Sequence, residues 1–368
     1  MGISMRCRWA LPALLASVLL APVANAQDMP ALAVQTRIVE VLEREALYRD
    51  KVDWQAIRTR LQSANADPAQ TWQQVRDAIA VSSAGHGRWL PPTHPLLQSS
   101  SSRGSVAATP APSATPAPSA TQRTHEPGAM QQRTAQQRDM DTVGRRIGWM
   151  TVGAFSGSGP GDSAAWQRTS LAFAGTLQTA IRSKDQAERC GWVVDLRGNG
   201  GGNMWPMLLG LAPLLEEADG HPPRVGAFTT ADSERSWSLH DGAVWHEQKK
   251  MLDAGAAEYR LRHPGAPVAV LLGPRTASSG EATALAFRGR AATRSFGQPT
   301  AGLSTGNRTE RLPDGSTLLV TGNVMVDRNG QGDGRKIAPD VVVGEGEDAA
   351  GAARDWLLAQ PACAASAR

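Results

Sequence analysis

The sequence predicts an α/β (α+β) domain that is preceded by a small helical domain and a low-complexity linker. Three observations support this organisation. Apolar residues recur at helical spacing in the first quarter of the chain, a Ser/Pro/Ala/Thr-rich stretch follows, and strand-like and helix-like segments then alternate. Such alternation is typical of a largely buried sheet. We therefore expect a helical domain at 27–96, a linker at 97–142, an α/β domain at 143–346 and a C-terminal tail at 347–368.

The first 26 residues have the three regions of a secretory signal peptide. Arg6 and Arg8 provide a basic start, an apolar run covers 10–21, and Ala-Asn-Ala at 24–26 is a small-residue cleavage site. The apolar run is short for a membrane anchor. We therefore expect a chain that is cleaved after residue 26 and exported, periplasmic or secreted, with no membrane span in the mature part.

Charge and cysteine content exclude several classes of protein. The formal net charge is +4, and it falls to +2 when the segment 1–26, with two arginines and no acids, is removed (4 − 2 = 2). Because no stripe of Lys and Arg is present, we expect no nucleic-acid partner. Cys190 and Cys363 remain, without the spacing of a zinc site, so we expect no metal and no cofactor. In an oxidising compartment these two cysteines are expected to pair.

The N-terminal domain is predicted to be helical from the spacing of its apolar residues. Asp53 is well placed to cap the middle helix. The apolar positions that share helix faces are Val34, Ile38, Val41, Leu42, Trp54, Ile57, Leu61, Trp72, Val75 and Ile79.

The linker at 97–142 contains the repeat "APSATPAPSAT". Such a composition cannot bury enough apolar surface to offset the entropy of ordering, so we expect a flexible tether. In the α/β domain the strand-like segments are "RIGWMTVGAF", "GWVVDL", "APVAVLLG", "STLLVTGNVMV" and "DVVV", and the helix-like ones are "TSLAFAGTLQTAIRS" and "GEATALAFRG".

A glycine-rich stretch, "DLRGNGGGNM" at 195–204, follows one of these strands. It lacks the Gly-Lys-Ser/Thr of a P-loop and the last glycine of a dinucleotide fingerprint. The stretch precedes an apolar helix, whose N-terminal amides favour negative charge. Backbone N–H groups at this turn could stabilise an oxyanion. The alternative is a tight turn without a chemical role.

A second strand-to-helix turn, "GPRTASSGEATALAF", carries Ser278 and Ser279. A serine at such a turn is exposed beside helix N-terminal amides, as a nucleophile requires. The alternative is an ordinary helix cap. The turn is not the G-x-S-x-G elbow.

Four segments in order resemble the S41 serine peptidases, the family of tail-specific and C-terminal processing proteases. They are "GWVVDLRGNGGGNMWPML", "VAVLLGPRTASSGEATALAFRGR", "FGQPTAGLSTGNRTERLPDGSTLLVTGNVMVDRNG" and "IAPDVVV". The resemblance implies a ClpP/crotonase-like spiral fold and a serine-type endopeptidase that acts on peptides or unfolded proteins. It also implies that Ser278 is the nucleophile, and that Gly201, Gly202 and the Ser279 amide form the oxyanion hole.

Two branches of the family use different general bases, so the resemblance alone does not identify the base. The C-terminal processing branch uses a lysine, but Leu303 occupies that position in "GQPTAGL". The tricorn-like branch uses a histidine from a preceding helical region. His86 in "AVSSAGHGRWLPP" matches that role, and we expect it to titrate near neutrality. The alternative is a surface histidine such as His94.

The acid that would orient His86 is predicted from its distance to the Pro-Asp motif. Related domains carry an acid about seven residues before that aspartate, which here selects Asp333, with Asp327 as the competitor. Both sit beside glycine-containing turns, where aspartate is common for local reasons. No PDZ-like segment is visible. An alternative function is a catalytically degenerate protein on the same fold that binds peptide or lipid.

Overall fold

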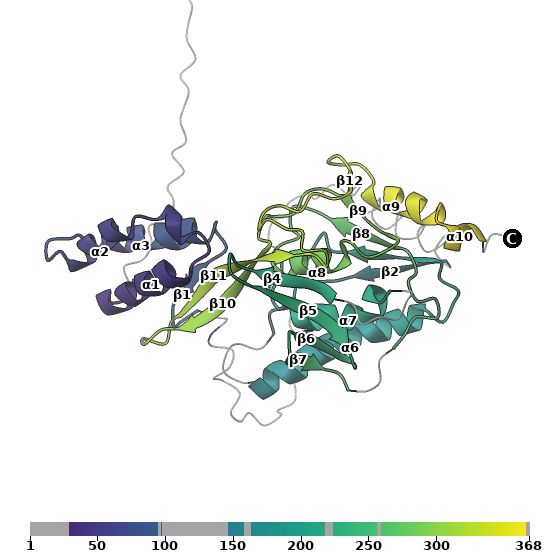
Figure 1. The fold of residues 1–368 in the computed structure, drawn as a ribbon, viewed down its shortest axis with the longest axis horizontal. Helices are drawn as coiled ribbons and strands as arrows, with labels where there is room; N and C mark the ends of the chain where they lie inside the picture. The colour runs from purple at the N-terminus through teal and green to yellow at the C-terminus, as the bar shows by residue number, and fades with distance from the viewer. Residues whose placement is uncertain are drawn as a thin grey trace, which may run out of the picture.

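The computed structural model of the chain describes residues 29–94, 97, 146–157, 163–217, 224–255 and 259–365. The predicted signal peptide lies outside these residues, and so does the predicted linker except for Leu97. Figure 1 shows the arrangement of the helices and strands.

Three helices form the N-terminal unit, as the apolar spacing predicts. They are α1 (Leu32–Glu45), α2 (Trp54–Gln62) and α3 (Pro68–Ser82), with a short 3-10 turn at Arg49–Lys51. The Asp53 carboxylate accepts a hydrogen bond from the Ala56 N–H and caps α2. The predicted apolar positions are buried in one cluster, so the helical assignment is confirmed.

The larger unit contains a parallel sheet and an antiparallel sheet. The parallel sheet has the order β12-β9-β8-β3-β2. Its strands are β2 (Ile147–Thr151), β3 (Gly191–Asp195), β8 (Val268–Leu272), β9 (Thr293–Gly297) and β12 (Val341–Val342). The central strands β3 and β8 are buried along their whole length, as expected for strands that are covered on both faces of the sheet.

The antiparallel sheet has the order β1-β11-β4-β5-β6-β7, with β10 also paired to β11. Its strands are β1 (Arg88–Leu90), β4 (Arg224–Thr229), β5 (Glu234–His240), β6 (Ala243–His246), β7 (Lys249–Asp253), β10 (Thr305–Arg311) and β11 (Thr317–Val326). Of these strands, only β11 is predicted from the sequence.

Helices cover both faces of the parallel sheet. Helix α9 (Ala349–Leu358) packs on one face (Figure 1) against Val193, Ala269 and Leu271. On the other side lie α6 (Ser163–Lys184), α7 (Met204–Leu215) and α8 (Ser279–Phe287). One apolar core joins α7 and α8 to both sheets. The predicted α/β class is confirmed.

The N-terminal unit shares its core with the antiparallel sheet. Strand β1, which follows α3, pairs with β11 through Arg88↔Leu319 and Leu90↔Thr317. Leu318 and Val320 of β11 are buried among the apolar side chains of the three helices. This pairing fixes the loop between α3 and β1 at the surface of the α/β domain.

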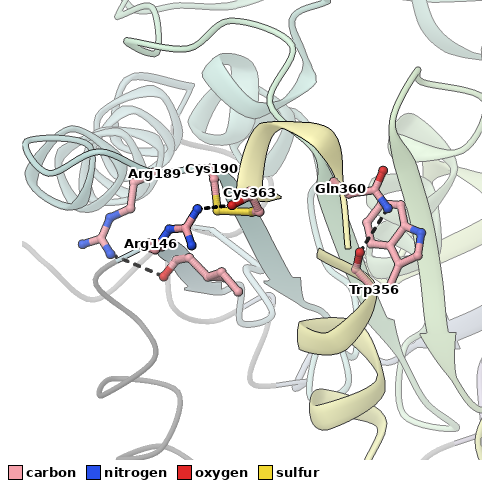
Figure 2. The surroundings of a disulfide bond; sticks show 7 residues. Arg146, Arg189, Cys190, Trp356, Gln360 and Cys363 are labelled. Atoms are coloured by element: carbon pink, nitrogen blue, oxygen red, sulfur yellow. Dashed lines mark hydrogen bonds between the residues drawn. A yellow bond between two sulfur atoms is a disulfide. The ribbon is translucent and has the colours of Figure 1, made fainter. Parts of the chain in front are cut away.

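The segment predicted to be a C-terminal tail folds as α9 and α10 (Pro361–Ala365). Cys363 in α10 forms a disulfide with Cys190, which directly precedes β3 (Figure 2). The predicted pairing is confirmed. The Arg146 guanidinium donates a hydrogen bond to the Cys363 carbonyl beside the bond. Among the described residues, no helix has both the length and the apolar character needed to cross a membrane.

The disulfide should stabilise the α/β domain, because it closes a loop with a sequence separation of 173. Replacing Cys363 with serine should reduce the free energy of unfolding by about 2–5 kcal/mol. Urea denaturation of the two proteins measures this difference. Reduced wild type should behave like Cys363→Ser, and equal stability of oxidised wild type and the variant would contradict the expectation.

Candidate active site

Ser278 lies at the turn between β8 and α8, in a backbone conformation that is unusual for its residue type. Its φ is +52° and its ψ is −115°. A positive φ disfavours residues with a side chain, and such conformations are common at functional sites. The Ser278 N–H donates to the Glu281 carboxylate at 2.8 Å. The turn therefore presents the hydroxyl at the start of α8 in a fixed geometry.

Glu281 holds this turn against a neighbouring loop. Its carboxylate is fully buried and also accepts hydrogen bonds from the Thr300 hydroxyl (2.5 Å) and the N–H groups of Gly302 (2.9 Å) and Leu303 (2.8 Å). Burial raises the pKa of Glu281, and the four hydrogen bonds act in the opposite direction. Leu303 occupies the position of the lysine in the C-terminal processing branch. Its backbone N–H binds Glu281, and its side chain cannot accept a proton.

His86 reaches Ser278 from the loop between α3 and β1. Its Nε2 lies 3.0 Å from the Ser278 Oγ, and its Nδ1 lies 2.6 Å from the Thr305 Oγ1 on β10. The Asn307 side chain donates to the His86 carbonyl at 3.1 Å. Serine and histidine are 192 residues apart in the sequence and are within hydrogen-bond distance, which is the geometry of a nucleophile and its base.

The structure does not place either predicted acid beside His86. Asp333 is exposed, and its carboxylate accepts from the Arg335 N–H in its own loop. Asp327 is buried, accepts from N–H groups of its own turn, and lies 3.6 Å from the Arg288 guanidinium. In the described part of the chain, no hydrogen bond joins either acid to the imidazole, whose second partner is the Thr305 hydroxyl. The orienting carboxylate stays a prediction.

Thr305 was missed because a threonine in a strand carries no motif of its own. It is almost fully buried and follows Leu303 by two residues. The sequence offers one clue to Thr305: it lies close to the position where the C-terminal processing branch carries its lysine base.

The Thr305 hydroxyl constrains the tautomer of His86 less strictly than a carboxylate would. For Nε2 to accept the Ser278 proton, Nδ1 must carry a hydrogen and donate it to Thr305. A hydroxyl can accept that hydrogen bond, but it can also donate one in the opposite tautomer. A carboxylate, in contrast, can only accept.

The pKa of His86 is lowered to about 4, first by burial of the imidazole and second by the positive charge of Arg88. The expectation of titration near neutrality is therefore wrong. No carboxylate contributes to this shift. Above about pH 5 the imidazole is neutral and able to accept a proton.

Two glycines bring the backbone of the glycine-rich turn against the serine turn. Gly201 has a φ of +99°, and a Cβ there would lie 2.8 Å from the Ala277 oxygen and 2.9 Å from the Ser278 Cβ. Gly202 has a φ of +115°, and a Cβ there would lie 2.1 Å from the Phe155 oxygen. Only glycine fits either position.

The three predicted oxyanion-hole residues differ in the availability of their N–H groups. The Gly201 N–H donates to the Asn199 side chain at 2.9 Å. Within the described ranges, the N–H groups of Gly202 and Ser279 donate to no protein acceptor. The Ser279 hydroxyl donates to the Gly202 carbonyl at 2.8 Å, which holds the two residues together. Gly202 and Ser279 are thus the available donors.

Helix α7 begins directly after this turn, and α8 begins at Ser279. The N-terminal ends of both helices therefore face the site and favour negative charge there. Within the described residues, no group of His, Cys, Asp and Glu side chains could hold a metal ion. The arrangement can support nucleophilic attack by Ser278 with backbone stabilisation of an oxyanion.

Comparison with known proteins identifies the family. Residues 146–343, more than half of the chain, match Peptidase family S41, and the chain belongs to this family. It is 36% identical over 175 residues to a nisin-resistance protein from Lactococcus lactis subsp. lactis. That match covers 46% of this chain and 50% of the relative, so the chain spans about half the length of the relative.

Two solved structures share the fold. A lipoprotein from Streptococcus agalactiae has a TM-score of 0.60 at 23% identity, with 89% of this chain and 96% of that chain covered. A putative peptidase from Parabacteroides merdae has a TM-score of 0.50 at 16% identity, with 90% and 98% covered. At these identities the similarity concerns the fold alone.

The low pKa of His86 predicts how the reactivity of Ser278 depends on pH. The rate of phosphonylation by a fluorophosphonate should change little between pH 8 and pH 5. It should fall as the pH decreases through about 4, because protonated His86 cannot accept the serine proton. In Thr305→Asp this fall in rate should occur at a higher pH, because a carboxylate stabilises the imidazolium. His94→Ala is the control. If the rate of the wild type fell near pH 6.5, the low pKa of His86 would be contradicted.

Gly201 and Gly200 offer a matched pair for testing the close approach of the two turns. Gly201→Ala should destabilise the protein by about 1–3 kcal/mol and slow phosphonylation of Ser278, because the new Cβ meets the serine turn. Gly200→Ala should behave like wild type, since its Cβ has open space. Thermal unfolding and labelling rates measure both effects, and equal behaviour of the two variants would refute the packing argument.

Proposed function

We propose that the protein is a serine-type endopeptidase of the Ser/His branch of family S41. The observation that carries this proposal is the 3.0 Å contact between His86 Nε2 and Ser278 Oγ. Ser278 is the nucleophile and His86 the general base. The N–H groups of Gly202 and Ser279 form the oxyanion hole, and Thr305 replaces the predicted Asp333 as the partner of the imidazole.

The proposed reaction has two halves. In acylation, Ser278 Oγ attacks the peptide carbonyl carbon while its proton passes to His86 Nε2. The carbonyl oxygen becomes an oxyanion that accepts hydrogen bonds from Gly202 and Ser279. The C–N bond then breaks, and His86 donates the proton to the leaving amine. In deacylation, water loses a proton to His86, attacks the ester and releases the acid product, and Ser278 regains its proton.

The surroundings of His86 favour the neutral imidazole, and this has a consequence for the rate. The imidazolium that forms in each half-reaction is buried near Arg88 and has a hydroxyl, not a carboxylate, at Nδ1. The low pKa makes His86 a weaker base than an imidazole that a carboxylate supports. We therefore propose a slow peptidase with a broad range of activity on the acid side of neutrality.

The proposed location is outside the cytoplasm, in the periplasm or secreted. The predicted signal peptide and the disulfide between Cys190 and Cys363 support export, because disulfides persist in oxidising compartments. The proposed substrate is a peptide or an unfolded protein. Since one relative is a nisin-resistance protein, nisin should be among the substrates tested.

The alternative function, a catalytically degenerate peptide- or lipid-binding protein, is favoured by one observation. The imidazole has a neutral hydroxyl where a carboxylate would stabilise its charged form. The intact contact between serine and histidine, together with the two available backbone donors, favours the peptidase.

The proposal is tested by comparing casein and nisin hydrolysis and fluorophosphonate labelling across variants. Ser278→Ala should abolish labelling and hydrolysis, and His86→Ala should reduce hydrolysis about a hundredfold or more. Ser279→Ala should still be labelled, because it keeps its backbone N–H. Wild type that binds these substrates, is not labelled and hydrolyses none of them would favour the alternative. Wild-type rates in His86→Ala would refute the assignment of the base.

A further inference from the structure

An aromatic cluster lies where α7 begins against the antiparallel sheet. We define it by Trp205 of α7, Phe228 of β4, Trp237 of β5 and His246 of β6. The Trp205 and Phe228 rings are 6.3 Å apart between centroids, and each also contacts Trp237 and His246. Trp237 is fully buried, whereas the other three side chains are half-buried. The cluster therefore has a buried base and an accessible rim.

One side of the cluster adjoins the oxyanion turn. Trp205 is the second residue of α7 and follows Gly202 by three residues. Gly202 in turn accepts the hydrogen bond from the Ser279 hydroxyl at 2.8 Å. Three residues span at most about 10 Å, so the Trp205 backbone lies close to the available N–H donors.

The other side adjoins strand β10, whose Thr305 side chain contacts His86. Gly306 follows Thr305 on β10, and a Cβ on Gly306 would lie 2.7 Å from the Phe228 ring and 2.1 Å from the Asn323 oxygen. A side chain at position 306 would collide with both residues. The cluster thus lies between the turn that supplies the oxyanion donors and strand β10, whose Thr305 contacts His86.

The cluster also contains polar atoms that lack partners. Nine buried side-chain nitrogen or oxygen atoms in the described part of the chain have no hydrogen-bond partner. Three of them belong to this region: the Trp237 Nε1, the His246 Nε2 and the Asn323 Oδ1. Buried polar groups are nearly always paired in folded proteins, so these three atoms lack partners that a bound water or ligand would supply.

We propose that the aromatic cluster is a substrate subsite that takes a large apolar side chain, aromatic or branched aliphatic, from the peptide residues flanking the scissile bond. This inference rests on the proposed function. The half-buried Trp205 and Phe228 rings contact the side chain. An extended peptide advances about 3.3–3.6 Å per residue, so a residue within three positions of the bond can reach the cluster.

The subsite is tested by binding, in a Ser278→Ala background where no hydrolysis occurs. The probes are fluorescein-labelled peptides of the form Ala-Ala-X-Ala-Ala, with X as Phe, Leu, Ala or Asp, and binding is followed by fluorescence anisotropy. The Phe and Leu peptides should bind about tenfold more tightly than the Ala peptide, because their side chains lose apolar surface to water. Adding Trp205→Ala or Phe228→Ala should reduce that ratio to about two or less.

Trp356 provides the matched control. It is a half-buried tryptophan on α9, across the parallel sheet, and its ring lies 5.8 Å from Phe296. Trp356→Ala in the same background should keep the tenfold ratio. The proposal is overturned if the parent protein has no apolar preference, or if the ratio persists in both Trp205→Ala and Phe228→Ala. A wild type that hydrolyses nothing but keeps the preference would refute the peptidase and leave a peptide-binding site.

A second measurement needs no substitution in the cluster and therefore does not depend on whether those variants fold. A peptide with benzoylphenylalanine at X is photo-crosslinked to Ser278→Ala, and the tryptic fragments are identified by mass spectrometry. Crosslinks should fall in fragment 198–224, which contains Trp205, in fragment 225–235, which contains Phe228, or in fragment 236–249, which contains Trp237 and His246. Crosslinks confined to other fragments would overturn the proposal.

Discussion

The site depends on the pairing of one short strand with the antiparallel sheet. Strand β1 has three residues, and it pairs with β11 directly after the loop that carries His86. The apolar side chains of the helical unit surround Leu318 and Val320 of β11, so the pairing is supported by a shared core. Because the proposed nucleophile Ser278 lies in the turn before α8, its distance from the proposed base His86 is set by how this core packs. A change in the packing would move the imidazole even if every catalytic residue were retained.

The other half of the site depends on close approach of backbone to backbone. The glycine-rich turn touches the serine turn at Gly201 and forms an isolated β-bridge with Phe155 at Gly202, and no side chain fits at either place. The buried Glu281 then ties the serine turn to the loop at 300–303. The strained Ser278 backbone is therefore held from two sides, which is how a conformation that costs free energy can persist.

The neutral partner of His86 distinguishes this site from a triad with a carboxylate. The Thr305 hydroxyl can orient the ring, but it adds no negative charge that would stabilise the imidazolium. Burial and Arg88 lower the pKa further. In the proposed mechanism, the imidazole of His86 stays neutral and available at acidic pH but is a weaker base.

Local signals in the sequence were sufficient for the elements and residues that short-range chemistry determines. The apolar spacing predicted α1, α2 and α3, and the alternation predicted the strands β2, β3, β8, β11 and β12. The motifs predicted Ser278 and His86 as partners. The strands β4 to β7 and the role of Thr305 were not predicted. Those strands are polar on their exposed faces, and a threonine acquires its role only from what packs against it. Partners more than 200 residues apart, such as His86 and Thr305, meet only when the helical unit and the sheet share a core. Tertiary packing therefore decided which group contacts His86 Nδ1. The hydrogen-bond partners of a buried imidazole depend on distance in space and not on distance along the chain.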